Sequence, residues 1–118
     1  MNNGVRFQFL RDSKGQPVGC VAIKTIDGKA HNGPGGYCMV EYQFSVLNPL
    51  DHFDRTLARD IASHRLEKRS ISAGTLPHHP SMHHITERVM EHLATAYPIP
   101  SRAKKAAKLW LRTHKEHS

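Results

Sequence analysis

Four arginines at helix-compatible spacing are the residues of this sequence best suited to bind phosphate. Over an expected helix from residue 49 to about 69, steps of about 100° place the arginines on one face and a narrow apolar sector on the opposite face. The arginines are Arg55, Arg59, Arg65 and Arg69, and the apolar residues are Leu50, Phe53, Leu57 and Ile61. A guanidinium group can bind phosphate through two parallel hydrogen bonds and can stack on bases. The pattern indicates a surface for an anionic nucleotide, and a solvated charged face remains the alternative.

Two alanines, Ala58 and Ala62, lie on or beside this arginine face. Their small side chains would let a flat ligand or a second helix approach the backbone. Three nearby carboxylates could neutralise part of the positive charge. They are Asp51, Asp54 and Asp60.

A second basic surface lies on an expected last helix, from Arg102 to about His114, and one of its faces carries Lys105, Lys108, Arg112 and Lys115. Three interpretations stay open: a solubilising face, contacts to a nucleic-acid backbone, or one wall of a small anion pocket. An aromatic residue for base stacking could come from Phe53, Tyr97 or Trp110. The candidate ligand-binding residues are Asn48, Phe53, Arg55, Arg59, Arg65, Arg69, Lys105 and Arg112.

Histidines are frequent, and four of the ten lie between His78 and His84. Neutral imidazole is a ligand for zinc, copper or nickel. These four, however, fall in an expected proline-containing loop without the His-Glu-x-x-His pattern of a helical zinc site. We expect a polar loop that titrates below neutral pH, and no metal site.

The sequence offers little for catalysis. It contains no nucleophile elbow and no interpretable Ser-His-Asp set, and neither cysteine has a neighbour that would activate it. His52 and His64 could act as acid and base in phosphodiester cleavage, although histidines on a half-exposed helix are the simpler interpretation. We therefore expect a binding protein without catalytic residues or cofactor.

The elements that would position these residues divide into two halves. Residues 5–47 alternate between apolar and polar, which is typical of three or four antiparallel strands. Turns are expected at residues 12–15 and as a tight hairpin at Asp27-Gly28, and residues 31–36 form a loop before a long strand over 37–47. Cys20 and Cys38 are expected to be small buried residues rather than a disulfide scaffold.

After Leu47 the apolar period changes to that of a helix. Asn48 is expected to cap the first helix, followed by a loop over residues 70–84 and a second helix that Tyr97-Pro98 ends. Ser101 is a candidate cap for the last helix. The sequence thus predicts one α+β domain over residues 1–118, with a β-meander over 1–47 and a helical part over 48–118.

Length and charge limit the classes of function. The chain has 118 residues, a formal net charge of +7 and a sequence pI of about 9.8. It is too short for a large cofactor-binding fold, and its charge favours an anionic partner such as nucleic acid or a nucleotide. It shows neither a secretory signal nor a bilayer-spanning run, so we expect a cytoplasmic protein without membrane contact.

The segment 44–66, FSVLNPLDHFDRTLARDIASHRL, resembles a pattern of small phage proteins: a strand, then Pro-x-Asp-x-Phe-x-Arg/Lys, Ile-Ala and Arg-Leu. The family it resembles is that of the Thoeris anti-defence proteins, which act as sponges for signalling nucleotides. The resemblance covers about one fifth of the chain closely. This sequence departs from the pattern at Thr56, where the family has a basic residue, and at Ala58 and His64, where it has glycine.

The resemblance implies that the protein sequesters, without cleavage, a cyclic nucleotide immune signal of the cyclic ADP-ribose type, or a cyclic oligonucleotide. It also implies a homo-oligomer, a dimer or hexamer, acting in the host cell cytoplasm during infection. Arg55, Arg59 and Arg65 would face the phosphates, and Phe53 would be core or base-stacking. The alternative is a basic nucleic-acid-binding or anti-CRISPR-type phage accessory protein.

Overall fold

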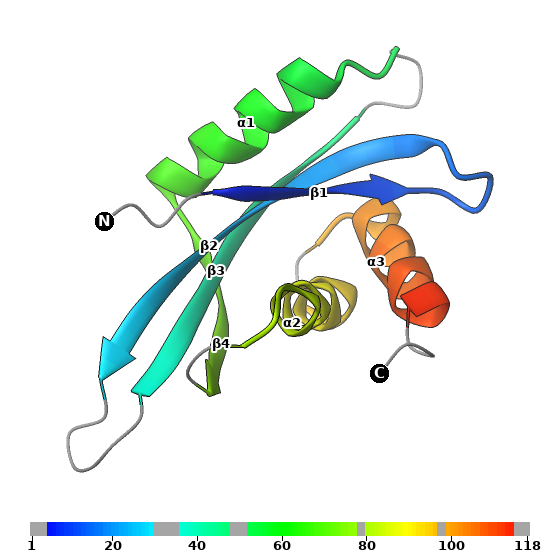
Figure 1. The fold of residues 1–118 in the computed structure, drawn as a ribbon. Helices are drawn as coiled ribbons and strands as arrows, with labels where there is room; N and C mark the ends of the chain where they lie inside the picture. Colours follow the sequence, from blue (N-terminus) through cyan, green and yellow to red (C-terminus); the bar gives the residue numbers. More distant parts are fainter. Residues whose placement is uncertain (1–4, 30–35, 48–51, 78–79, 97–98, 115–118) are drawn as a thin grey trace.

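The computed structural model describes residues 5–29, 36–47, 52–77, 80–96 and 99–114. In this part of the chain, four strands and three helices form an α+β fold, which confirms the predicted fold class (Figure 1). The elements are β1 (Arg6–Arg11), β2 (Pro17–Lys29), β3 (Gly36–Val46), α1 (Arg55–Lys68), β4 (Ile71–Pro77), α2 (Met82–Thr95) and α3 (Ser101–His114).

The sheet is antiparallel, with the strand order β1-β2-β3-β4. The turn between β1 and β2 forms as predicted, because Asp12 Oδ1 accepts the backbone N–H groups of Lys14 and Gln16, each at 2.9 Å. Gly15 supports the same turn with a φ of 81°. The hairpin predicted at Asp27-Gly28 is wrong, since β2 continues through both residues and pairs with β3 as far as Lys29.

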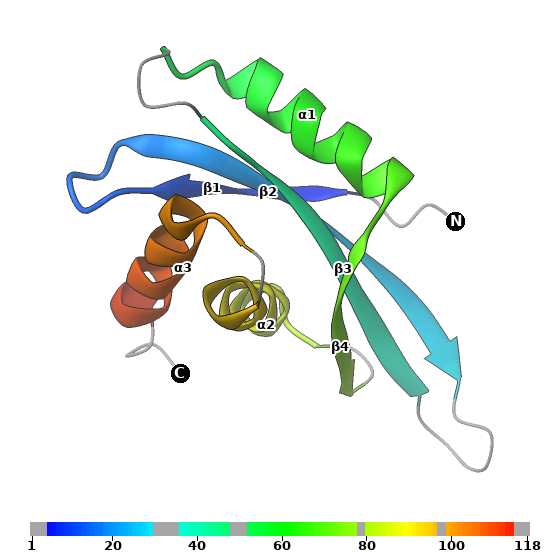
Figure 2. The ribbon, with the colours of Figure 1, turned by 180° about the vertical axis from the view of Figure 1, so that it is seen from behind.

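Helices cover both faces of the sheet (Figures 1 and 2). Helix α1 lies against one face, over β2 and β3, and helices α2 and α3 lie against the other. Side chains alternate between these two layers along each strand. Phe7 and Phe9 therefore point toward the α1 side, whereas Leu10 belongs to the core on the α2 and α3 side.

The larger core lies between the sheet and helices α2 and α3. It holds the largest fully buried side chains, Tyr42, Leu10, Met90, Leu93, Val21, Val40 and Val89. Tyr42 Oη lies 2.6 Å from His92 Nδ1, so the buried hydroxyl has a polar partner. Helices α2 and α3 are amphipathic as predicted, and α3 buries Ala103, Ala106 and Ala107.

The smaller core lies under α1 and corrects the predicted orientation of that helix. The helix buries Ala58, Ala62 and Leu66 against the sheet, and Leu57 is 53% exposed. The arginine-bearing side thus faces the sheet, where the opposite had been expected. The small side chains of Ala58 and Ala62 let the helix backbone come close to the sheet.

Two element boundaries also differ from the prediction. Helix α1 begins at Arg55, where Asp54 Oδ1 accepts the Leu57 N–H at 3.0 Å; Asn48, the expected cap, lies outside the described residues. The expected loop over residues 70–84 contains β4 and the first turn of α2. Ser81 caps α2, and Ser101 is the first residue of α3 rather than its cap.

Over the described residues, no helix has the length and apolar character needed to cross a bilayer.

Candidate phosphate-binding groove

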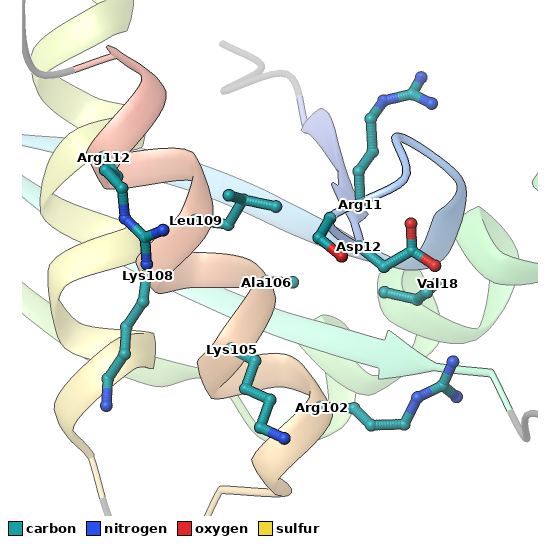
Figure 3. A pocket seen from close by; sticks show the side chains of 10 residues that line it. Arg11, Asp12, Val18, Arg102, Lys105, Ala106, Lys108, Leu109 and Arg112 are labelled. Carbon is teal, nitrogen blue, oxygen red and sulfur yellow. The ribbon is translucent and has the colours of Figure 1, made fainter.

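A hollow of about 470 Å³ lies between α3 and the turn that joins β1 to β2 (Figure 3). Val18, Ala106 and Leu109 form its apolar centre, and charged side chains surround them. Helix α3 reaches this position because its alanine face packs on the sheet and directs its basic face toward the β1–β2 turn. We call this hollow the basic groove.

Among the described residues, five cationic side chains line the basic groove, four from α3 and one from the end of β1. They are Arg102, Lys105, Lys108, Arg112 and Arg11. Between Lys105 and Arg112 the helix makes two turns, so these charges are spread over about 10 Å of its axis. The groove therefore combines an apolar floor with several separated cations, which suits a ligand that has a flat body and phosphate groups.

The local charge in the basic groove is largely unopposed. Asp12 is the carboxylate that lines it, and the backbone of the turn already engages its Oδ1. Within the described parts of the chain, the ion pairs are Lys24–Glu41 at 3.5 Å and Arg88–Glu91 at 4.0 Å, both outside the groove. An anion entering the groove would therefore meet more positive than negative charge among the described residues, with five cations against the Asp12 carboxylate.

Backbone carbonyls fix two of the five cations. Arg11 Nη1 donates to the Gly15 carbonyl at 2.9 Å, and Arg102 Nη1 donates to the Leu47 carbonyl. Each guanidinium retains further N–H groups for a ligand. These hydrogen bonds restrict the motion of both side chains, which lowers the entropy cost of any further contact with a ligand.

A second hollow of about 370 Å³ adjoins the first along β1 and shares with it Arg11, Asp12, Ser13, Ala106 and Leu109. Trp110 lines this second hollow, but its indole ring is already in contact with two histidine rings. The ring stacks on His114 with centroids 4.2 Å apart, and His83 lies 5.8 Å away. Trp110 is thus held in a ring stack, while Tyr97, the other aromatic proposed from this half, lies outside the described residues.

The predicted arginines of α1 lie on the other side of the sheet. Arg55 lies over the Phe9 ring at 5.3 Å, and Arg59 lies over the Phe7 ring at 4.7 Å, both within the range of a cation–π contact. Phe53 packs edge-on against Phe9, with centroids 5.8 Å apart. Three of the predicted site residues therefore form an aromatic and cationic layer on the sheet.

The remaining two α1 arginines contact the backbone at other points. Arg65 Nη1 donates to the Phe44 carbonyl at 2.9 Å, and Arg69 ends the helix, with its own carbonyl accepting from Gln43 Nε2 at 2.8 Å. The ligand-binding residues predicted from the sequence therefore lie on two opposite faces of the sheet. Lys105 and Arg112 belong to the basic groove, and the α1 residues belong to the opposite face.

Sequence reasoning placed Lys105 and Arg112 in the candidate site but omitted Arg11 and Arg102 from it. Arg102 was visible as part of the basic last helix. Arg11 directly precedes the turn at Asp12, and only the pairing of β1 with β2 brings that turn beside α3. A strand-end cation next to a turn is a weak signal when the partner helix lies about ninety residues away.

Catalytic groups are sparse around the basic groove. Of the described residues that line the hollow, Ser13 supplies a hydroxyl, and none is a histidine or a cysteine. His52 and His64 are both exposed on the α1 side. Cys20 and Cys38 are buried, as predicted, and burial raises the pKa of the Cys20 thiol to about 11 and also raises that of Cys38. These thiols are protonated at neutral pH and are poor nucleophiles.

The residues that the structure describes include no group of three or more metal-ligating side chains. His78 and His79 lie outside them, and His83 and His84 are adjacent, with ring centroids 6.4 Å apart.

Comparisons with protein-family models, curated proteins and solved structures find no match for this chain. The arrangement of its residues is therefore the basis for the functional argument that follows.

Proposed function

We propose that this protein binds and retains a small nucleotide through its phosphates, in the basic groove, without cleaving it. The observation that carries the proposal is that, among the described residues, five cations from α3 and β1 line a hollow of about 470 Å³ that has an apolar centre. The guanidinium groups suit phosphate geometry, and the floor suits the flat face of a base or a ribose. Retention of a ligand requires affinity and no catalytic group.

The resemblance of residues 44–66 to the Thoeris anti-defence sponges narrows the ligand class under this proposal to cyclic nucleotide signals. On the same basis, we propose a homo-oligomer that acts in the cytoplasm of an infected cell. The proposed site differs from the one that the resemblance implies. The basic groove uses Arg102, Lys105 and Arg112 of α3, whereas Arg55 and Arg59 of α1 lie on phenylalanine rings.

The test is ligand retention and release. The protein is incubated with cyclic ADP-ribose isomers and with cyclic di- and trinucleotides, separated from free ligand, and heat-denatured, and the released molecule is identified by mass spectrometry. We expect an intact cyclic nucleotide. The matched variants are Lys105→Ala/Arg112→Ala in the groove and Lys68→Ala/Arg69→Ala on α1, which remove the same formal charge from two places.

The groove variant should lose retention by about a hundredfold, as expected for two phosphate contacts of somewhat more than 1 kcal/mol each, and the α1 variant should retain the ligand. A released but cleaved ligand would contradict a non-catalytic role and direct attention to His52 and His64. Failure to retain any member of the panel would remove the sponge function and leave nucleic-acid binding as the use of the positive charge.

A further inference from the structure

The two basic faces of the molecule meet at the free edge of β1. This strand is the first in the sheet order and pairs only with β2 among the described strands. Arg11 at its end lines the basic groove, and Phe9, two residues earlier, lines the adjoining hollow. Phe9 also carries Arg55 on the α1 side. One strand edge therefore connects the α3 cations to the α1 cations.

The cations on the α1 side are oriented by the rings beneath them. The centres of the Arg55 and Arg59 guanidinium groups lie 5.3 Å and 4.7 Å from the centroids of Phe9 and Phe7. Both arginines are exposed, so a ring covers part of each group while solvent reaches the rest. A guanidinium that stacks on an aromatic ring can still donate in-plane hydrogen bonds to phosphate.

The described carboxylates near these arginines form no ion pair with them. Asp54 Oδ1 accepts the Leu57 N–H as the cap of α1. Asp60 is exposed and, at about 100° per residue, lies on the side of α1 away from buried Ala62. No ion pair joins Arg55 or Arg59 to a carboxylate within the described part of the chain. The α1 end of the β1 edge is therefore positive, as the α3 end is.

We propose that the basic groove is one end of a longer track for single-stranded nucleic acid, which runs from α3 over the edge of β1 to Arg55 and Arg59. This inference rests on the proposed phosphate binding in the groove and extends it to a ligand with several successive phosphates. The order along the track is Arg112, Lys105, Arg11, Arg55 and Arg59.

A single strand suits this path better than a duplex does. The track turns around the edge of a strand from one face of the sheet to the other, and a flexible chain with one phosphate per nucleotide can follow such a turn. A duplex is stiff, with a persistence length of about 150 base pairs. Aromatic side chains beside a basic groove are also the usual features of single-strand-binding surfaces. Here Trp110 lines the adjoining hollow and stacks on His114, and the rings of Phe9 and Phe7 lie beneath Arg55 and Arg59 on the α1 side.

The test measures affinity against ligand length. Fluorescently labelled thymidylate oligomers of about 2, 4, 8 and 16 nucleotides, lengths that cover the usual site sizes, are titrated with the wild-type protein, with the groove variant Lys105→Ala/Arg112→Ala and with two variants of the α1 side. The track variant is Arg55→Ala/Arg59→Ala. The matched control is Lys68→Ala/Arg69→Ala, which removes the same charge from the far end of α1. Circular dichroism melting confirms that each variant is folded.

For the wild type we expect affinity to rise at least tenfold between the shortest and the longest oligomer. The track variant should bind the shortest oligomer normally and lose most of the gain with length. Its dependence of log K on log salt should also be shallower by about 0.7 for each lost phosphate contact. The control variant should behave like the wild type.

Two other outcomes separate this inference from the proposed function. If long oligomers bind no more tightly than short ones, or if both variants lose the same amount, the track is wrong while phosphate binding in the groove stands. If neither the oligomers nor the cyclic nucleotides bind, or if binding is unaffected by Lys105→Ala/Arg112→Ala, both proposals fall.

Discussion

The two faces of the sheet use similar side chains in different ways. Under α2 and α3 the core contains Tyr42, Leu10, Met90 and Leu93, and the cations of α3 stand at the margin of a hollow. Under α1 the buried cluster is small, with Ala22, Ala62 and Leu66, and the space beside it is covered by arginines on phenylalanine rings. On one face the cations surround an open site, and on the other they form part of the packing.

This difference shows that a basic helical face can have two roles, and that the strand beneath it decides between them. Phe7 and Phe9 provide apolar rings for Arg55 and Arg59, whose aliphatic stems and planar heads can pack there. Under α3, alanines take the contact with the sheet, and the longer basic side chains project past it. The comparison can be tested at several positions.

The largest effect is expected from filling the narrow space under α1. Ala62 is fully buried against the sheet, so Ala62→Leu should lower the free energy of unfolding by about 3 kcal/mol through overpacking. Urea denaturation followed by circular dichroism measures this change. A neutral or stabilising result would show that this side of α1 does not face the sheet.

The next effect is a loss of stability at alkaline pH, which depends on how well the helices exclude water from the two faces of the sheet. Cys20 on the α1 side is fully buried, and its pKa is raised from 9.0 to about 11, mainly by burial. Folded protein therefore keeps a proton that the unfolded chain releases, so stability is complete below pH 9 and falls as the pH rises toward 11. The expected loss is about 2 kcal/mol.

Urea denaturation at a series of pH values measures this loss, and Cys20→Ala should make the dependence shallower. Cys38 and Tyr42, whose pKa values burial also raises, add to the alkaline loss from the other face. Stability that is flat between pH 9 and 11 would mean that water reaches Cys20 under α1.

A smaller difference should separate equivalent arginines on the two faces. Arg59→Ala removes a cation–π contact with Phe7 and should cost about 1 kcal/mol of unfolding free energy. It should also raise the pKa of Cys20 further, because the Arg59 charge lowers it. Arg112→Ala, at the margin of the groove, should leave stability nearly unchanged.

Thermal denaturation measures the first effect, and the alkaline pH range over which stability is lost measures the second. Equal stability losses for Arg59→Ala and Arg112→Ala would contradict the distinction between cations that pack on phenylalanine rings and cations at the margin of the groove.

The smallest effect should be at Leu57, on the side of α1 away from the buried alanines. Because this side chain is 53% exposed, Leu57→Ala should change the free energy of unfolding by no more than about 0.5 kcal/mol. If denaturant titrations show that the free energy of unfolding falls by 2 kcal/mol or more, Leu57 faces the sheet, as the sequence alone predicts.

That orientation shows where sequence reasoning reached its limit. The alternation in residues 5–47 and the helical spacing of Ile85, Val89 and Leu93 predicted strands and helices correctly. For α1 the usual assumption, that large apolar residues face inward, failed at Leu57. The decisive partners of the helix, Phe7 and Phe9, lie on a strand about fifty residues earlier, and no local pattern connects them to it.

The missed strand β4 has a local cause. Gly74 has a φ of 91°, and the pairing with β3 shifts register between Met39 and Glu41, which is the signature of a bulge. The glycine and the nearby proline are typical of a loop in sequence, yet here Gly74 lies within an edge strand and Pro77 ends it. The basic groove could likewise be predicted only in part. Its α3 residues share one helix face, whereas Arg11 lies beside them only because β1 pairs with β2 in the sheet.

The measurement that tests the central claim most directly is the position of bound phosphate. ¹⁵N-labelled protein is titrated with inorganic pyrophosphate, which resembles the diphosphate group of cyclic ADP-ribose, and backbone amide shifts are followed by NMR. We expect saturable shifts over α3 and the turn from Arg11 to Gly15, and little change at Ala58 and Ala62 in α1. Shifts confined to α1, with α3 unaffected, would contradict the assignment of the phosphate site to the basic groove.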